Sequence, residues 1–277
     1  MKSYREFIIE SYSDIKSICE KYRITNYTIN SDGSIDVDGD VDLSEKRITK
    51  LPLKFRNVRG DFYCSYNQLT ALEGGPKTVG GDFNCGYNQL TTLEGSPQSV
   101  GGNFYCSYNQ LTTLEGSPKT VGGNFNCGNN QLTTLEGGPQ SVGGGFYCRN
   151  NQLTTLEGSP QTVGGNFNCS NNQLTTLEGG PRSVGGNFYC SNNQLVNLNG
   201  FPEDFEDDIS LEDDISLDNN PVSEIYNLFK DYKCIKWLNE FDVIQGDRVI
   251  MDRLEEVYHQ LGMNIPENIE FRNYEII

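Results

Sequence analysis

Seven cysteines recur at strict intervals of 21 residues: Cys64, Cys85, Cys106, Cys127, Cys148, Cys169 and Cys190. Each lies in the same phrase, for example FYCSYNQLTTLEGSPKTVGGN over residues 104–124. A repeat this short cannot bury its own apolar face, so the copies must stack into a solenoid with a shared core. The period therefore predicts an elongated body whose function depends on the residues that the stack leaves facing water.

Within each unit the F-x-C alternation predicts a strand that points Phe and Cys into the core and the residue between them to solvent. An Asn follows three residues after every Cys, at 67, 88, 109, 130, 151, 172 and 193. Buried Asn side chains can hydrogen-bond the backbone of a turn and of its neighbour, so these predict a stacked ladder. Leu residues two and five positions after each Asn pack beneath the strand, and a Gly, Pro, Val, Gly-Gly series returns the chain.

The phrase FxCxxNQLTTLEGxP resembles the leucine-rich-repeat signature LxLxxNxLxxL. The resemblance covers about residues 41–225, with a degenerate first repeat (Val41, Leu43, Ile48, Leu51) and a degenerate last one over residues 215–225. The EGxPxxVGGxFxC variant is most similar to uncharacterised 21-residue leucine-rich-repeat proteins of large tailed bacteriophages. One departure concerns the return arm, where Val lies four residues before Phe and the family usually has Leu three before.

The resemblance implies an α/β repeat fold, a curved right-handed solenoid with a parallel β-sheet on its concave face and irregular turns outside. It also implies recognition of a protein partner by the concave face, although a fold alone specifies no function. Bacterial members that are ubiquitin ligases carry a large catalytic domain with a cysteine nucleophile. Here the C-terminal piece is short, and Cys234 has no CxD context. We therefore expect no such activity.

The outward position between Phe and Cys alternates strictly between tyrosine and asparagine: Tyr63, Asn84, Tyr105, Asn126, Tyr147, Asn168 and Tyr189. After Cys come Ser or Gly, with Arg149 as the one charge, and then Tyr66, Tyr87 and Tyr108, which can stack at the spacing of adjacent strands. Tyr, Ser, Gly and Asn make adaptable binding surfaces, so we predict that this face binds the partner. The alternative is that a two-repeat duplication copied Tyr and Asn without selection for contact, because exposed Tyr also suits a strand.

Charge and hydropathy limit the classes of partner and the compartment. The net charge is −17, and residues 203–277 hold 20 acidic against 6 basic side chains. This argues against direct nucleic-acid binding, which needs clustered Lys and Arg. No stretch is apolar enough to span a membrane, and the amino terminus lacks a signal-peptide pattern. We expect a cytoplasmic protein, in the host bacterial cytoplasm if it is phage-encoded.

The cysteines and the acidic residues suggest no catalytic or metal site. Stacked equivalent cysteines point the same way, so we expect buried, reduced thiols rather than disulfides. There is no CxxC, and His259 is the only histidine, so we expect no metal and no cofactor. A column of glutamates, one per repeat from Glu73 to Glu178, reads as solvated surface. Because no nucleophile, base and orienting group converge, we expect no enzyme.

The last repeat is six residues longer than the others, since Leu217 follows Cys190 by 27 residues. This insertion, at about residues 203–214, concentrates an acidic patch: Asp204, Glu206, Asp207, Asp208, Glu212, Asp213 and Asp214. Such a patch could mimic nucleic acid and block a nucleic-acid-binding protein. A solubilising loop at the end of a solenoid is the ordinary alternative.

We expect three segments: an N-terminal helix and capping strand over residues 1–40, the solenoid over 41–221, and a helical cap over 222–277. Helical spacing covers residues 3–21, and an alternating strand pattern covers 33–43. Short helices are expected within 222–231, 234–241 and 248–262, with Gly262 as a C-cap and a strand within 269–277. The function expected is non-enzymatic protein binding, with acidic mimicry, or sequestration of a small molecule or nucleotide on the tyrosines, as alternatives.

Overall fold

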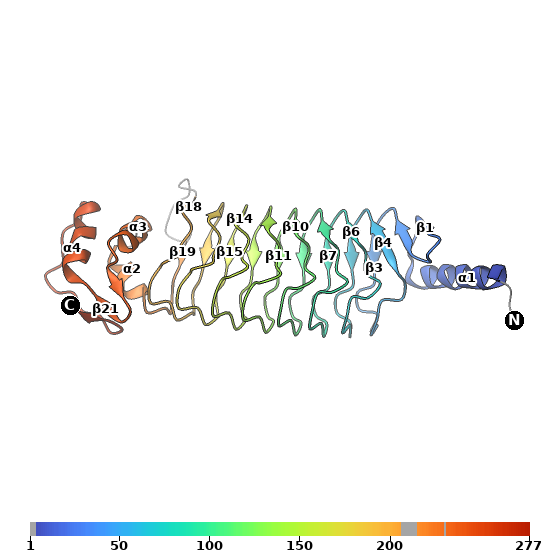
Figure 1. Ribbon diagram of the computed structural model, residues 1–277, viewed down its shortest axis with the longest axis horizontal. Helices are drawn as coiled ribbons and strands as arrows, with labels where there is room; N and C mark the ends of the chain where they lie inside the picture. Colours follow the sequence, from blue (N-terminus) through green and yellow to red (C-terminus); the bar gives the residue numbers. More distant parts are fainter. Residues whose placement is uncertain (1–3, 206–214, 230) are drawn as a thin grey trace.

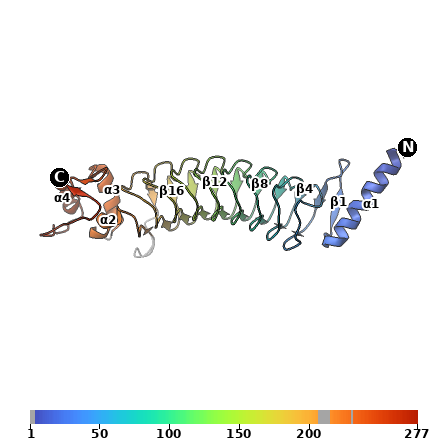
Figure 2. The same ribbon diagram turned by 90° about the horizontal axis from the view of Figure 1, so that it is seen from below.

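A computed structural model shows one row of stacked coils with helices at both ends (Figure 1). It describes residues 4–205, 215–229 and 231–277. The two chain termini lie at opposite ends of the row, which is only slightly curved in either view (Figures 1 and 2). The predicted solenoid of stacked repeats, with helices at both ends, is therefore confirmed.

The F-x-C segments form a nine-stranded sheet, here called the FxC sheet, in the order β19-β17-β15-β13-β11-β9-β7-β5-β3. Every neighbouring pair is parallel, and each Phe pairs with its equivalent in the next coil, as Phe104 does with Phe125. The first coil enters through Val41, which pairs with Phe62, as the degenerate repeat predicted. The strands are β3 (Val41–Asp42), β5 (Phe62–Tyr63), β7 (Phe83–Asn84), β9 (Phe104–Tyr105), β11 (Phe125–Asn126), β13 (Phe146–Tyr147), β15 (Phe167–Asn168), β17 (Phe188–Tyr189) and β19 (Ile215–Ser216).

The return arm forms a second sheet, here called the return sheet, where we expected irregular turns. It has ten strands in the order β1-β2-β4-β6-β8-β10-β12-β14-β16-β18, all parallel except the β1–β2 hairpin. Its strands are β1 (Tyr27–Ile29), β2 (Ile35–Val37), β4 (Phe55–Val58), β6 (Thr78–Val79), β8 (Ser99–Val100), β10 (Thr120–Val121), β12 (Ser141–Val142), β14 (Thr162–Val163), β16 (Ser183–Val184) and β18 (Asp204–Phe205). The displaced valine is thus the buried residue of a short strand.

Glycine after each repeat valine, from Val79 to Val184, lets the coils approach closely. A Cβ on Gly122 would lie 2.1 Å from the Gly101 carbonyl oxygen, and one on Gly101 would lie 2.2 Å from that of Gly80. The Gly122 N–H donates to the Val100 carbonyl at 3.0 Å. A side chain here would push neighbouring coils apart, which explains the Val-Gly-Gly phrase.

The core runs the length of the row. The seven repeat phenylalanines are fully buried, and neighbouring rings stack with centroids 5.2–5.7 Å apart. The seven repeat cysteines and the two leucines that follow each Asn are buried beside them. The cysteines therefore face inward, as the alternation predicted.

The predicted Asn ladder is also present. Asn130 Oδ1 accepts the Leu111 N–H of the preceding coil at 3.1 Å. Its Nδ2 donates to the Cys127 carbonyl at 3.0 Å and to the Cys106 carbonyl at 3.2 Å. Asn220 makes the equivalent bonds to Leu195, Cys190 and Leu217 in the last coil. Each Asn therefore holds its own turn and fastens it to the coil before.

At the N-terminal end, helix α1 (Tyr4–Tyr22) leads into the β1–β2 hairpin. Cys19 of α1 is buried, and Ile15, Ile18 and Tyr22 pack against the core. The rest of the helix extends away from the end of the stack (Figures 1 and 2). Only the last turns of the predicted helix therefore cover the first coil.

The C-terminal cap contains α2 (Ser223–Phe229), α3 (Lys233–Glu240), β20 (Ile244–Gln245), β21 (Arg248–Val249), α4 (Met251–Gln260) and β22 (Glu275–Ile276). Its core continues that of the solenoid through Leu217, Val222 and Ile225. Gly262 has φ +66°, and its N–H donates to the His259 carbonyl, as expected of a C-cap. Residues 248–249, predicted as helix, instead pair with β20 and β22.

Candidate functional site

The Tyr/Asn alternation lies on the outer side of the FxC sheet. We call Tyr63, Asn84, Tyr105, Asn126, Tyr147, Asn168 and Tyr189 the ladder column. Its members pair in register from strand to strand, as Tyr105 does with Asn126, and all seven are half-buried. The structure therefore brings these predicted residues together in one line along the solenoid.

Neighbouring side chains hold the ladder tyrosines in place. The Tyr63 hydroxyl donates to Asp61 Oδ2 at 2.8 Å, and Asn187 Nδ2 donates to the Tyr189 hydroxyl at 2.6 Å. Tyr147 lies over Gly145, where a Cβ would fall 2.6 Å from the hydroxyl oxygen. Rings fixed in this way lose little conformational entropy when a partner binds.

The ladder asparagines are oriented by their own turns. Asn84, Asn126 and Asn168 each accept, through Oδ1, the backbone N–H two residues ahead at 3.0 Å. This Asx-type bond fixes the amide, so its NH₂ group is the end left for another acceptor. In the part of the chain that the structure describes, no protein acceptor takes these three NH₂ groups.

The residue two positions after each Cys, here called the exit position, has a left-handed backbone in all seven repeats, with φ between +54° and +58°. Asn occupies it in the later coils, at 129, 150, 171 and 192. In the first three coils it holds Tyr66, Tyr87 and Tyr108, which we call the tyrosine stack. Their rings stack with centroids 4.3 and 4.2 Å apart and with interplanar angles of 10° and 11°.

The tyrosine stack is open to solvent. Tyr66, Tyr87 and Tyr108 are 54%, 41% and 44% exposed, and within the described coils they are the only large apolar side chains that are exposed. Because the rings face one another, the stack presents mainly ring edges and hydroxyls. The predicted stacking is therefore present, but it leaves no face between rings where a flat ligand could insert.

Arg149 is exposed, as expected of the one charge in its column. The other positions after Cys hold small residues that are buried or half-buried: Ser65, Gly86, Ser107, Gly128, Ser170 and Ser191. The repeat glutamates, from Glu73 to Glu178, are exposed at the opposite turn. Arg149 is thus the one charged side chain at this position in the seven repeats.

A second polar column was missed by the sequence reasoning. The residue before each strand Phe accepts the equivalent N–H of the next coil, as Asp61 accepts that of Asp82 at 2.7 Å and Asn103 that of Asn124 at 2.8 Å. The signal was an Asp or Asn before every Phe except Phe146, which follows Gly145. In the first coils this column is acidic, because it begins with Asp40, Asp61 and Asp82.

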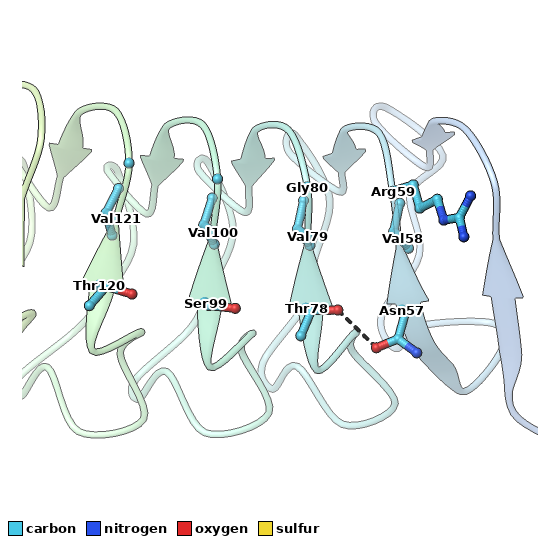
Figure 3. Close-up of a pocket in the computed structure, with 12 residues that line it drawn as sticks. Asn57, Val58, Arg59, Thr78, Val79, Gly80, Ser99, Val100, Thr120 and Val121 are labelled. Carbon is cyan, nitrogen blue, oxygen red and sulfur yellow. Dashed lines mark hydrogen bonds between the residues drawn. The ribbon is translucent and has the colours of Figure 1, made fainter.

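The return sheet carries shallow grooves, which the sequence did not predict. One of about 570 Å³ crosses β4, β6, β8 and β10, and another of about 520 Å³ lies over β12 to β16. Figure 3 shows the first, with Thr78, Ser99 and Thr120 along it and Arg59 at its end. Thr78 donates to Asn57 Oδ1 at 2.8 Å. Hydroxyls and one terminal Arg provide no acid and base pair for catalysis.

A cavity of about 750 Å³ lies between the last coil and the cap. Trp237, Ile235 and Leu261 line its apolar side, and Lys233, Lys236 and Glu203 its polar side. The Trp237 ring stacks on Phe241 at 5.5 Å and has Lys236 Nζ 4.9 Å from its centroid.

The nine cysteines all lie in the described part of the chain, are buried and form no disulfide. Burial raises the pKa of every repeat thiol well above its ordinary value, as for Cys106 and Cys127. Burial also raises the pKa of Cys234. A thiol is a nucleophile or metal ligand only as the thiolate, so burial of these side chains disfavours both roles.

The predicted acidic patch falls mostly outside the described residues. This applies to Glu206, Asp207, Asp208, Glu212, Asp213 and Asp214. Asp204 lies in β18, which pairs with β16 at the regular interval, and Tyr189 of β17 pairs with Ser216. The extra residues of the last repeat therefore lie after Phe205, later than the start at about residue 203 that we expected.

Comparison with solved structures finds a leucine-rich-repeat-like neighbour among the matches only at low similarity. YopM from Yersinia enterocolitica WA-314 aligns with a TM-score of 0.31 and 14% identity over 71% of this chain. The alignment covers 57% of the YopM chain. No protein-family model matches, and no curated protein matches.

Two further properties concern metals and membranes. No group of three or more His, Cys, Asp or Glu among the described residues could hold a metal ion. No helix in the described ranges is long and apolar enough to cross a membrane.

Proposed function

We propose that this protein is a non-enzymatic binding module that recognises a protein partner on the outer face of the FxC sheet. The binding face comprises the ladder column, the tyrosine stack and Arg149. The observation that carries the proposal is the tyrosine stack, which places three exposed aromatic side chains at backbone positions that favour asparagine. Repeat solenoids present extended surfaces of this kind to their partners.

The energetics of the stack support selection for contact rather than for stability. A left-handed backbone costs a bulky residue about 1–2 kcal/mol, and Asn tolerates it better. For three tyrosines this amounts to about 3–6 kcal/mol, of which the Asn of later coils avoids a part. Each of the two stacked aromatic pairs stabilises the fold by about 0.5–1.5 kcal/mol. Because stacking does no more than offset the backbone cost, exposed Tyr at these positions needs another reason, and partner binding provides one.

The rest of the face has the composition of a binding surface. Tyr gives rigid contact area, while Asn and Ser give hydrogen bonds. Hydrogen bonds with Asp61 and Asn187 hold Tyr63 and Tyr189, and Tyr147 lies over Gly145, so much of the surface is ordered before a partner arrives. Arg149 adds one charge that can select among partners.

A binding role rather than catalysis is supported by the protonated, buried thiols and by the lack of convergent acid and base groups on the described surface. The finer role, modulation of a host process by a phage protein in the bacterial cytoplasm, is part of the proposal and rests on the repeat resemblance alone. Sequestration of a flat molecule is disfavoured, because the rings of the stack already cover one another.

A differential selection tests the proposal. A displayed library of random peptides is selected on the full chain and, in parallel, on a variant with Tyr66→Asn, Tyr87→Asn and Tyr108→Asn. The variant keeps the fold, because later coils carry Asn with the same φ. We expect peptides enriched on the natural chain to bind the variant at least about tenfold more weakly, as for aromatic hot spots.

Substitutions on the return sheet, Thr120→Ser and Thr162→Ser, are the matched control, because alternate coils already carry Ser there. Their binding should be unchanged. If all enriched peptides bound the tyrosine variant as well as the natural chain, the stack would not belong to the binding face and the proposal would lose its main support.

A further inference from the structure

The ladder column repeats every two coils, and this period selects among the shapes that a bound peptide can take. Large tyrosine side chains alternate with shorter asparagines on strands that pair in register. Adjacent strands lie about 4.8 Å apart, so equivalent tyrosines recur about every 9.6 Å along the solenoid. The surface is therefore corrugated with this spacing from Tyr63 to Tyr189.

The asparagines between the tyrosines supply donors with the same period. The Oδ1 atoms of Asn84, Asn126 and Asn168 are each used by the backbone of their own turn at 3.0 Å. Their NH₂ groups thus form three equivalent donors, one in each interval between tyrosines. A ligand that matches the period can present a carbonyl to each of them.

The two ends of the face differ in charge. Near Tyr63 lie Asp40, Asp61 and Asp82, and the ladder position of the first coil is the exposed Asp42. No ion pair in the described part of the chain involves these four carboxylates. Beyond Asp82 the same column continues with neutral Asn103 and Asn124, and Arg149 lies farther along. The face therefore carries most of its negative charge at its N-terminal end, and the exposed Asp218 adds one carboxylate in the last coil.

We propose that the ladder column binds a proline-rich segment of a partner protein in the polyproline II conformation, with an Arg or Lys at the end that lies over Asp61 and Asp82. This inference rests on the proposed function and names its class of ligand. Polyproline II has three residues per turn and a rise of about 3.1 Å, so equivalent side chains recur every 9.3 Å or so. That repeat agrees with the two-coil spacing to within about 0.5 Å.

Other extended or helical ligands do not match. In a β-strand, residues on one face recur about every 6.7 Å, which is out of phase with the tyrosines after one interval. Two turns of an α-helix span about 10.8 Å, and the error exceeds 3 Å over the three intervals from Tyr63 to Tyr189. Only polyproline II keeps every third residue between two tyrosine rings along the whole ladder.

The hydrogen-bonding needs of such a segment also match. Polyproline II has no internal hydrogen bonds, so its carbonyls must find other donors. The three ladder NH₂ groups are such donors, and proline rings pack well against tyrosine in aromatic-lined recognition sites. The preformed helix loses little entropy on binding, and the ladder side chains are already held by their neighbours.

The test is a fluorescence-polarisation titration of the full chain with a labelled peptide of about ten prolines, about 31 Å long, that carries two arginines at one end. The comparison peptide has the same arginines with glycine and serine in place of proline. We expect the proline peptide to bind at least about tenfold more tightly. Glutamates in place of the arginines should weaken binding, most strongly at low salt.

Two variants locate the site. Tyr105→Asn with Tyr147→Asn should weaken binding of the proline peptide by about tenfold or more, and alternate coils show that Asn fits there. Asp61→Asn with Asp82→Asn should remove the preference for the peptide that carries arginines. The Oδ1 atoms of the new asparagines can still accept the backbone N–H of the next coil, as Asn103 Oδ1 does. Thr120→Ser with Thr162→Ser on the return sheet should change nothing.

Equal binding of the glycine-serine peptide, or full binding by the Tyr105→Asn, Tyr147→Asn variant, would overturn the inference. The outcome of the differential selection then separates the two proposals. Suppose that proline peptides do not bind, but that other enriched peptides bind more weakly when Tyr66, Tyr87 and Tyr108 are replaced. The polyproline ligand is then wrong and the binding role stands. If no enriched peptide depends on these tyrosines, both are wrong.

Discussion

At the scale of single residues, identical backbone positions hold different side chains. The 21-residue period predicted that Tyr66, Tyr87 and Tyr108 would be neighbours, and their rings stack. It did not predict their left-handed backbone, because a hydrophobic repeat carries no information about φ. The available signal was Asn129 and its equivalents, since Asn is enriched at positive φ. That comparison turns three exposed tyrosines into an argument for binding.

The tyrosine stack should contribute little to stability. Replacing all three by Asn removes two stacked pairs but relieves backbone strain, so the free energy of unfolding should change by less than about 1 kcal/mol. Urea denaturation of the two proteins measures this. A loss above about 3 kcal/mol would show that the stack is structural and would remove its functional interpretation.

The buried asparagines should behave differently. In Asn130→Ala the Leu111 N–H loses its acceptor and the Cys106 and Cys127 carbonyls lose a donor. We expect a loss of about 2–4 kcal/mol, because buried polar groups would be left without partners. The exposed neighbour provides the control, since Gln131→Ala should cost less than about 0.5 kcal/mol in the same denaturation experiment.

At the scale of elements, the FxC sheet was predictable and the return sheet was not. Alternating Phe and Cys mark a strand with one buried side, and the register follows from the repeat. Thr120 and Val121 form a strand of only two residues, too short for an alternation to be read. What makes it a strand is the close approach of whole coils through Gly122, a tertiary effect. The same limit applies to β20 and β21 in the cap.

Gly122→Ala tests the close packing of the return sheet. Its Cβ would lie 2.1 Å from the Gly101 carbonyl, so neighbouring coils must separate. We expect a loss of more than about 2 kcal/mol, as in other overpacked sites. Thr120→Ser in the adjacent strand residue should be nearly neutral. A fully stable Gly122→Ala protein would mean that the coils do not approach as closely as described.

At the scale of the whole molecule, the repeated core concentrates one kind of titratable group. Each repeat buries a cysteine, and burial raises the pKa of each thiol above its value in the unfolded chain. Below about pH 8 both states are protonated, so the thiols do not affect stability. Above the unfolded pKa of about 8.5, only the unfolded chain releases protons, and unfolding becomes more favourable.

Stability should therefore be flat below about pH 8 and fall steeply above about pH 9, by up to about 1.4 kcal/mol per pH unit for each buried thiol. Urea denaturation with reductant, at a series of pH values, measures the slope. In the Cys106→Ala, Cys127→Ala variant the fall in stability with pH should be shallower by the contribution of two thiols. The cavities left by the two substitutions lower stability at every pH and do not change this slope. An unchanged slope in that variant would contradict the account.

The ladder column and the tyrosine stack were identified from the sequence because outward positions in a repeat follow from the inward ones. The contacts that fix them were not, because a hydrophobic repeat does not show that the Tyr63 hydroxyl donates to Asp61 or that Tyr147 lies over Gly145. Side chains that sequence reasoning treated as free and adaptable are instead held in one arrangement. The binding face is therefore better ordered than its composition alone suggests.

The most direct test of this face is the dissociation constant of a selected peptide for two double variants of the full chain. Tyr105→Asn with Tyr147→Asn alters the ladder column, and Thr120→Ser with Thr162→Ser alters the return sheet. We predict a loss of affinity of about tenfold or more for the first and less than about twofold for the second. Equal affinities for the two variants would contradict the proposal that the outer face of the FxC sheet binds the partner.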